Sequence, residues 1–133
     1  MEKLKRRLEE AEKALKTLKE VSQEPYSVIV RDASIQRFEY TFEAFWKFLR
    51  DYLKEIEGIR CNSPKSCFRE ALATGLINEE QAMALLEMTD DRNLTSHTYI
   101  EEVAEQIYRK VEHYYKLMEV TFDLAKAKLQ NES

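Results

Sequence analysis

The chain has 133 residues, of which 44% are hydrophobic and 35% are charged, and its formal net charge is −4. This composition excludes a disordered chain and a membrane-embedded one, and the acidic balance argues against nucleic-acid binding without excluding it. Two glycines and two prolines are too few for the turns of a β-rich fold. We therefore predict a single all-α domain over residues 1–133.

The sequence shows no targeting segment and no metal motif. No apolar run approaches the roughly 20 residues of a membrane span, and the residues after Met1 lack the apolar core of a signal peptide. The spacing of Cys61 and Cys67 fits no common zinc motif, and the only histidines are His97 and His113. We expect a cytoplasmic protein with reduced thiols, no membrane contact, no bound metal and no cofactor.

The first predicted helix covers residues 3–21. Its apolar residues alternate steps of four and three, as in an amphipathic helix: Leu4, Leu8, Ala11, Leu15 and Leu18. A basic cluster opens the helix: Lys3, Lys5, Arg6 and Arg7. A solvated helix face is the simpler interpretation of this cluster, and a contact with a partner or with RNA is the alternative.

The second predicted helix begins after Ser27, whose hydroxyl can cap it, and ends at Gly58. The spacing of three and four continues along an aromatic-rich face, which we expect to form the core: Ile35, Phe38, Phe42, Phe45, Leu49, Tyr52, Leu53 and Ile56. Tyr40 and Trp46 lie beside this face, where they either widen it or mark a subunit interface.

Three further helices complete the prediction. A short one starts at Ser63-Pro64 and stops at Gly75, and the next runs from Asn78 to about Arg92. The last runs from about residue 98 to residue 129, and Thr98 with Glu101 has the spacing of a capping box. At about 1.5 Å per residue it would span on the order of 45 Å, so part of its apolar face could pack against another chain. Five helices of this kind predict an antiparallel up-and-down bundle.

Residues 90–99 interrupt the apolar pattern with a dense polar sequence, DDRNLTSHTY. Arginine suits bidentate contact with phosphate, and histidine titrates near neutral pH. Arg92 and His97 are therefore candidates for a phosphate-handling pair. The competing interpretation is a capped turn between two helices, in a bundle whose role is structural.

The spacing of Arg92, His97 and Tyr99 is similar to the R-x4-H-x-Y signature of HEPN domains. More narrowly, the chain resembles the branch known as nucleotidyltransferase substrate-binding proteins or HepT toxins. The similarity extends over nearly the whole chain through two further blocks: residues 37–43 with Trp46, and Pro64 with residues 69–71 and 75–77. One departure is Ile100, because an acidic residue usually follows the tyrosine in that family.

The resemblance implies a helical bundle that forms a homodimer and pairs with a separate minimal nucleotidyltransferase (MNT) subunit. Members that act as toxins are metal-independent ribonucleases, and the partner neutralises them by transferring AMP to the motif tyrosine, here Tyr99. The alternative is a noncatalytic subunit that binds the substrate or nucleotide of the transferase. The chain is not itself a nucleotidyltransferase, because neither Gly58 nor Gly75 is followed by the serine of the phosphate-binding turn.

If the chain cleaves RNA without a metal, it needs a base, an acid and a positive charge at the phosphorus. We expect Arg92 and His97 to be the catalytic residues, with Arg92 as the charge. Binding or orienting residues are expected at Asp91, Asn93 and Thr95, and Asp91 is a candidate to hold Arg92. One chain offers one motif histidine, so a symmetric dimer would supply two around a shared cleft.

Overall fold

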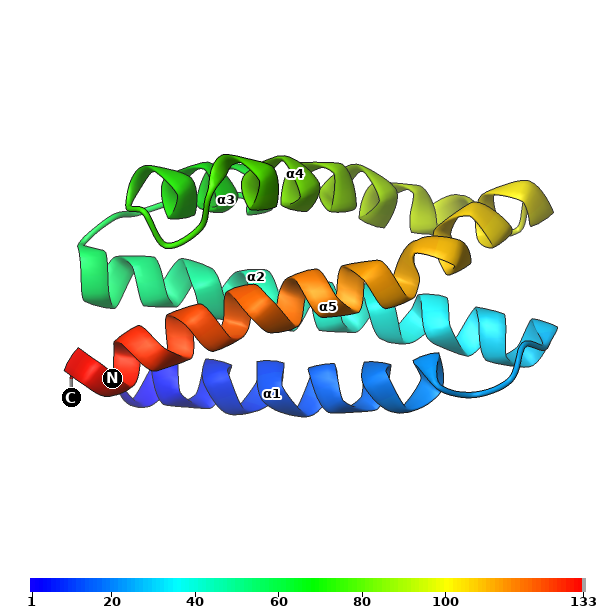
Figure 1. The fold of residues 1–133 in the computed structure, drawn as a ribbon, viewed down its shortest axis with the longest axis horizontal. Helices are drawn as coiled ribbons and strands as arrows, with labels where there is room; N and C mark the ends of the chain where they lie inside the picture. The colour runs from blue at the N-terminus through cyan, green and yellow to red at the C-terminus, as the bar shows by residue number, and fades with distance from the viewer. Residues whose placement is uncertain (133) are drawn as a thin grey trace.

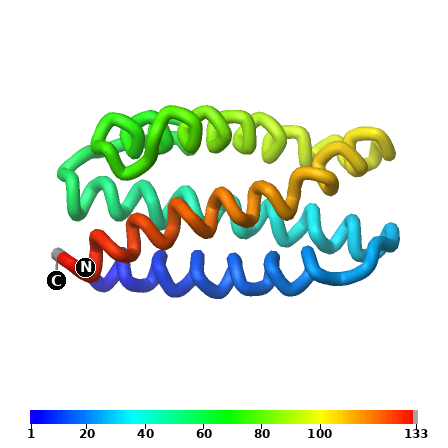
Figure 2. Tube along the Cα trace, viewed as in Figure 1, coloured from blue at the N-terminus to red at the C-terminus, as the bar shows by residue number. Residues whose placement is uncertain are grey.

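The structure is a computed structural model that describes residues 1–132. Its elements in chain order are α1 (Glu2–Ser22), α2 (Val28–Glu57), α3 (Pro64–Ala73), α4 (Glu79–Asn93), the 3-10 helix η1 (Leu94–His97) and α5 (Glu101–Glu132). The helices α1 and α4 run in one direction, and α2 and α5 run in the other (Figure 1, Figure 2). The prediction of an all-α, antiparallel bundle of about five helices is confirmed.

The predicted helix boundaries agree with the structure wherever a local cap specifies them. Ser27 caps α2, and Ser63 and Asn78 each form a capping box at the start of α3 and α4. Gly58 ends α2 with φ 68°, and Gly75 follows α3 with φ 81°. Both values lie in the left-handed region, which a residue without a Cβ adopts at little cost.

The core is centred on α2, which contacts each of the other α-helices. For this reason the buried surface of α2 is wider than the single face that was predicted. It includes Phe38 of that face and also Trp46 and Phe48, which lie outside it. The Phe38 ring stacks on Tyr114 of α5 with centroids 5.5 Å apart. Fully burying one such side chain stabilises the fold by roughly 1.5–3 kcal/mol. Trp46 thus widens the core, whereas Tyr40 is exposed and its hydroxyl lies 2.6 Å from that of Thr17 on α1.

The two cysteines form a disulfide, so the prediction of reduced thiols is wrong. Cys61 lies in the turn after α2, and Cys67 lies in the first half of α3. Ser63 and Pro64 begin α3 between them and fold the chain back, which leaves the two Cα atoms 5.2 Å apart. That separation lies within the range that a disulfide spans.

The predicted capping box at Thr98 is also wrong, because η1 separates α4 from α5 and α5 begins at Glu101. The Thr98 hydroxyl donates a hydrogen bond to the Thr95 carbonyl (3.3 Å) rather than capping α5. The first turn of α5 instead closes on the Ile100 carbonyl, which accepts from the backbone N–H groups of Val103 and Ala104.

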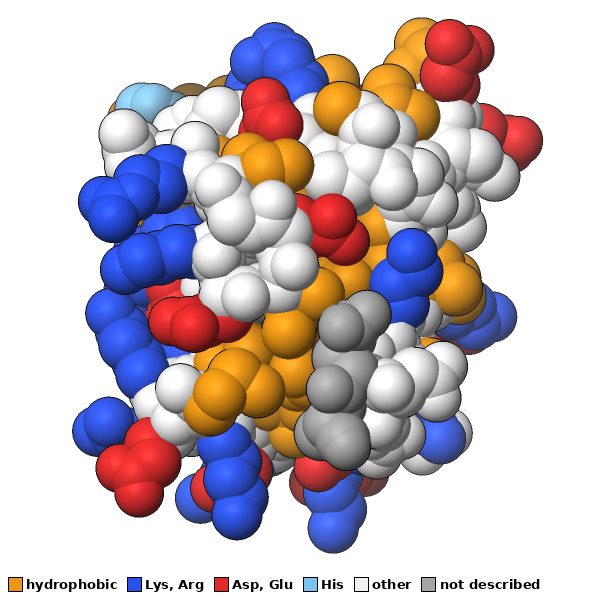
Figure 3. All heavy atoms as spheres, turned by 90° about the vertical axis from the view of Figure 1, so that its left-hand side faces the viewer, with side chains coloured by type: hydrophobic (Ala, Val, Ile, Leu, Met, Phe, Trp, Pro, Cys, Tyr) orange, Lys and Arg blue, Asp and Glu red, His pale blue; other side chains and the backbone are white. Residues whose placement is uncertain are grey.

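The two ends of the bundle differ in their surface chemistry. At the end where α1 begins, Lys and Arg side chains gather along one edge of the face (Figure 3). The opposite end carries the segment from η1 to the start of α5 (Figure 1). No helix within residues 1–132 is long and apolar enough to cross a membrane.

Candidate functional site

The last turn of α4 and the adjoining η1 place the motif residues at one end of the bundle. Arg92 lies on α4, Thr95 and His97 lie in η1, and Tyr99 lies between η1 and α5. The 3-10 turn is tighter than an α-helix, so it turns the chain away from the α4 axis within four residues. The structure therefore brings Arg92, His97 and Tyr99 into one short surface segment.

The Arg92 guanidinium is anchored on two sides. Its Nη2 lies 3.3 Å from Oε1 of Glu43 on α2, and its Nη1 donates to Oγ1 of Thr95 at 3.4 Å. The Thr95 hydroxyl in turn donates to the Arg92 carbonyl (2.7 Å), so Thr95 contacts both the side chain and the backbone of Arg92. The Arg92 side chain remains 27% exposed, so it is not sealed off from a ligand at the surface.

One polar atom of this arginine lacks a partner. Nε of Arg92 is buried and has no hydrogen bond to any atom of residues 1–132. A buried donor without an acceptor is unfavourable by about 1–3 kcal/mol. The guanidinium of Arg92 is therefore incompletely paired within the protein, although Glu43 and Thr95 bind its two Nη atoms.

Glu43 is the carboxylate that orients Arg92, and its role was not predicted. Besides Arg92, it accepts a hydrogen bond from Nε1 of Trp46 (3.1 Å) and lies 3.9 Å from Nζ of Lys47. Glu43 and Arg92 are separated by 49 positions in the chain, so spacing gave no indication of the pair. The one signal in the sequence was the position of Glu43 within the block of residues 37–43 that resembles the HEPN family.

Asp91 does not hold Arg92, which corrects that part of the prediction. Its Oδ2 accepts a hydrogen bond from the Tyr114 hydroxyl (2.5 Å) and lies 3.2 Å from Nζ of Lys110. Burial and the Asp91 carboxylate together raise the pKa of Tyr114, and the hydrogen bond to Asp91 raises the pKa of Lys110. Asp91 therefore ties the end of α4 to α5, while Asp90 pairs with Lys65 of α3 at 2.6 Å.

The remaining predicted residues are open to solvent. His97, Asn93 and Tyr99 are all exposed, and Tyr99 is 74% exposed. The rings of His97 and Tyr99 lie edge to face, with centroids 6.0 Å apart and planes at 84°. Both the imidazole and the phenol are thus accessible to another molecule, and a group attached to the phenol would lie beside the imidazole.

A second arginine fixes the start of α5, and sequence analysis missed it. The side chain of Arg31 on α2 is 4% exposed, and its Nη1 lies 2.6 Å from Glu101 and 3.0 Å from Glu105. Hydrogen bonding to Arg31 lowers the pKa of Glu101. The pKa of Glu105 is lowered mainly by its hydrogen bond from the Tyr26 hydroxyl and, to a smaller extent, by its hydrogen bond from Arg31. These contacts hold the helix that follows Tyr99 against α2.

Large apolar side chains surround the motif on the surface. Leu94 and Ile100 flank His97 and Tyr99 in the chain. Leu94, Tyr99 and Ile100 are exposed hydrophobic residues. Val28 and Ile29, in the first turn of α2 at the same end of the bundle, are exposed as well. Grouped exposed apolar residues of this kind mark contact surfaces for other molecules.

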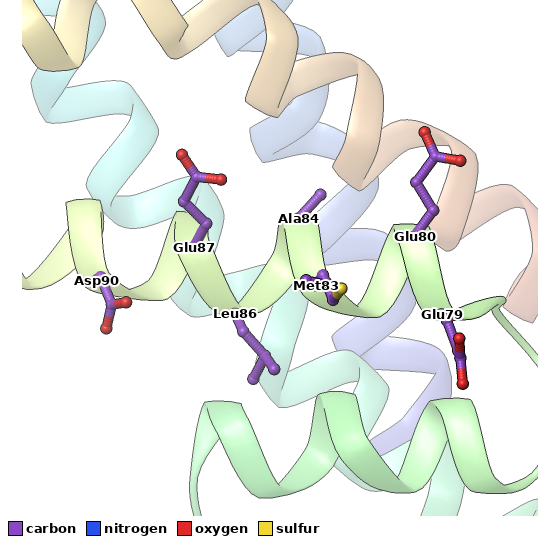
Figure 4. A pocket seen from close by; sticks show the side chains of 7 residues that line it. All are labelled: Glu79, Glu80, Met83, Ala84, Leu86, Glu87 and Asp90. Atoms are coloured by element: carbon purple, nitrogen blue, oxygen red, sulfur yellow. The ribbon is translucent and has the colours of Figure 1, made fainter.

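A hollow on the outer face of α4 has the wrong charge for a phosphate ligand. Four carboxylates line it, two on each side of Met83 (Figure 4): Glu79, Glu80, Glu87 and Asp90. Like charges repel a phosphate, so this hollow does not extend the motif site. Residues 1–132 contain no group of three or more His, Cys, Asp or Glu side chains that could hold a metal ion.

The sequence and the fold are similar to those of known proteins. Residues 6–127 match the model of the family described as "Nucleotidyltransferase substrate binding protein like". A protein of Haemophilus influenzae named "Probable ribonuclease HepT" is 31% identical over 103 residues, which cover 74% of this chain and 68% of that protein.

Two solved structures share the fold. A crystal structure of a Thermus thermophilus protein has 52% sequence identity and a TM-score of 0.84, and the match covers 86% of this chain and 98% of the other. The second is the tri-AMPylated HEPN toxin of Shewanella oneidensis in complex with an MNT antitoxin, with 20% identity, 93% and 96% coverage, and a TM-score of 0.73. At that identity the second similarity establishes the fold alone.

Proposed function

This chain belongs to the nucleotidyltransferase substrate-binding protein family, and from that membership we propose that it is the HEPN subunit of a HEPN/MNT toxin–antitoxin pair. We propose that it acts as a metal-independent endoribonuclease, which its MNT partner silences by AMP transfer to Tyr99. The observation that carries the proposal is the partly exposed side chain of Arg92, held by Glu43 and Thr95 in the segment that exposes His97.

The proposed reaction follows from these side chains. A base removes the proton of a ribose 2′-hydroxyl, the 2′-oxygen bonds to the adjacent phosphorus, and the bond to the 5′-oxygen breaks as that oxygen receives a proton. His97 would act as base or acid. Arg92, whose side chain is partly exposed, would stabilise the charge on the phosphoryl oxygens. Asn93, exposed in the same segment, would orient the substrate.

A homodimer is part of the proposal. One chain supplies one motif histidine, whereas the reaction uses both a base and an acid. The exposed apolar residues around the motif, Leu94, Ile100, Val28 and Ile29, provide a surface that a second copy could cover. A two-fold axis close to this surface would bring two His97 and two Arg92 side chains to one cleft. Sedimentation of a monomer alone at micromolar concentration would contradict this arrangement.

AMP transfer is proposed at Tyr99 because its phenol is exposed and next to the motif histidine. The Tyr99 oxygen would bond to the α-phosphorus of ATP, pyrophosphate would leave, and the phenolic proton would pass to solvent or to a base of the partner. The attached phosphate would compete with RNA for Arg92 by charge and by bulk. The Shewanella toxin is itself AMPylated in its complex with an antitoxin, which supports extending this chemistry here.

RNA and ATP as reactants favour a cytoplasmic location, which we propose as well. A disulfide is uncommon in that compartment. Here Cys61 is 6% exposed and Cys67 is fully buried, so reductants have little access to either sulfur.

The second candidate is a noncatalytic subunit that binds the substrate of the transferase, which is the role given by the family's description. It is favoured by the same Arg92 site, which suits a nucleotide phosphate as well as an RNA phosphate. The two candidates differ in whether His97 performs proton transfer.

The experiment that separates them compares the two histidines of the chain. Both His97 and His113 are exposed, so His113→Ala is a matched control for His97→Ala. We expect the purified parent to cleave RNA in the presence of EDTA, His97→Ala to lose at least about 100-fold in rate, and His113→Ala to retain the rate. Absence of cleavage by the parent, or equal rates for both variants, would favour the binding subunit.

A further inference from the structure

Two adjoining hollows lie at the end of the bundle opposite the motif. One, of about 430 Å³, is formed by the first turns of α1, and the other, of about 230 Å³, is formed by α1, the end of α2 and the turn after it. Lys3 lines both hollows, which joins them into one surface. Six cations and two carboxylates, Glu10 and Asp51, line this surface, which we call the basic surface; the cations are Lys3, Arg6, Arg7, Arg50, Lys54 and Arg60.

Two of the six cations are fixed by a carboxylate at the centre of the basic surface. Nε of Arg7 and Nε of Arg50 lie 3.2 Å and 3.0 Å from the two oxygens of Asp51. Burial alone would raise the pKa of Asp51, but Arg50, Lys3 and Arg7 outweigh burial and hold that pKa below its usual range. Asp51 is therefore ionised at neutral pH, and it orders the two guanidinium groups around it.

The other four cations are free to meet a ligand. The side chains of Lys3, Arg6, Lys54 and Arg60 make no hydrogen bond or ion pair with any residue of the described chain, 1–132. Their charge is concentrated here although the protein as a whole carries a net charge of −4. A local excess of positive charge on an acidic protein attracts a polyanion to that part of the surface.

We propose that the basic surface binds the phosphate backbone of RNA and holds it at a distance from the motif. This proposal rests on the proposed ribonuclease function, which supplies RNA as the polyanion. The cations come from three separate segments and extend over two hollows, which fits an extended polymer better than a single small anion. Guanidinium groups also match phosphate oxygens in pairs and stack on bases.

The test measures RNA binding without cleavage. The full chain with His97→Ala serves as the parent, and its binding to a fluorescein-labelled single-stranded RNA is followed by anisotropy over a range of salt concentrations. Each phosphate contact on single-stranded nucleic acid contributes about 0.7 to the slope of log K against log salt. Changing the four free cations to Gln should therefore reduce the slope by about 3 and weaken binding at least tenfold at low salt.

A second quadruple variant controls for net charge. Lys13, Lys16, Lys116 and Lys128 are exposed and lie outside the basic surface, and changing them to Gln alters the net charge by the same amount. We expect this variant to keep the slope of the parent. Equal losses in both quadruple variants would overturn the proposal, because binding would then depend on overall charge. An unchanged slope in the first variant would overturn it as well.

Two further measurements complete the test. Arg60→Gln alone changes one exposed, unpaired side chain in a turn, so folding is preserved, and the slope should fall by about 0.7. If the parent binds vesicles containing phosphatidylserine but not RNA, the surface recognises membranes and the proposal is wrong. Cleavage is assayed separately with His97 present, so loss of RNA binding and absence of ribonuclease activity are distinguished.

Discussion

Arg31 and Arg92 lie near the same end of the bundle, and each meets a carboxylate from a distant helix, but they are neutralised to different degrees. Arg31 is 4% exposed and lies within 3.0 Å of three carboxylates: Asp32, Glu101 and Glu105. Arg92 is 27% exposed and pairs with Glu43 alone, and its Nε has no partner among the described residues.

The comparison shows how surrounding charge separates a structural arginine from one that can bind an anion. The positive charge of Arg31 is exceeded by its neighbours, so a phosphate would be repelled there. Arg92 is balanced by one carboxylate and is partly exposed, so a phosphate would not be repelled there. The same residue type thus fastens α5 to α2 in one place and lies in the proposed binding site in the other.

The strongest test of the difference between Arg31 and Arg92 is to change each of them to lysine. Lysine cannot reproduce bidentate contact with phosphate, so Arg92→Lys should lower the RNA cleavage rate by about 100-fold or more. Arg31→Lys should leave that rate close to the parent's. Single-turnover cleavage of a labelled RNA measures both, and equal losses would show that Arg92 has no special role.

Thermal stability should show the reverse order. Arg31→Met leaves three carboxylates facing one another without a cation, and we expect Tm to fall by several degrees. Arg92→Met leaves only Glu43, which is partly exposed and retains Lys47, so the fall should be smaller. Melting followed by circular dichroism at pH 7 provides the values. A larger fall for Arg92→Met would contradict the assignment of roles.

Glu43→Gln tests whether Arg92 needs its anchor. The amide oxygen can still accept the hydrogen bond from Trp46, so the fold should be preserved, but the charge that orients Arg92 is lost. We expect kcat for RNA cleavage to fall about tenfold with a smaller change in KM, because displacement of a positioned group affects the transition state most.

The control for Glu43→Gln is Glu39→Gln, one turn earlier on α2, which makes no ion pair with any described residue. This variant should cleave at the parent rate. A common loss in both variants would point to a general effect of charge on α2.

The smallest expected effect is on the dependence of Tm on pH below neutrality. The pKa values of Glu101 and Glu105 are lowered in the folded state, so their pairing contributes stability above their usual pKa of 4.5. That contribution is lost as the pH falls below 4.5 and through the lowered values. Tm measured from pH 7 to pH 3 should fall less in Glu101→Gln/Glu105→Gln than in the parent. Parallel curves would rule out this linkage.

Local signals in the sequence predicted most of the fold. Ser27 and Asn78 cap their helices through side chains three residues from the amides they bind, so spacing alone identified both starts. Thr98 had the same spacing to Glu101, but the Glu101 carboxylate binds Arg31, which lies 70 positions away. The spacing was misleading there because α5 begins only at Glu101, after η1, so Thr98 does not stand at the start of the helix.

The sequence indicated which residues form the candidate site but not which residues support them. Arg92, His97 and Tyr99 stand within one short motif, whereas the Glu43–Arg92 pair depends on how α4 packs on α2. The disulfide was missed for a related reason. A separation of six positions has no characteristic meaning until the turn at Ser63 and Pro64 brings Cys61 and Cys67 together.

The exposure of Tyr99 also determines where the folded chain is vulnerable to cleavage. Residues 98–100 connect η1 to α5, and both Tyr99 and Ile100 are exposed there. Exposed connections between helices are preferred sites of proteolytic nicking, and chymotrypsin cuts after tyrosine. A segment open enough for the proposed AMP transfer is also open to a protease, so digestion at Tyr99 would report whether a partner or an attached nucleotide covers it.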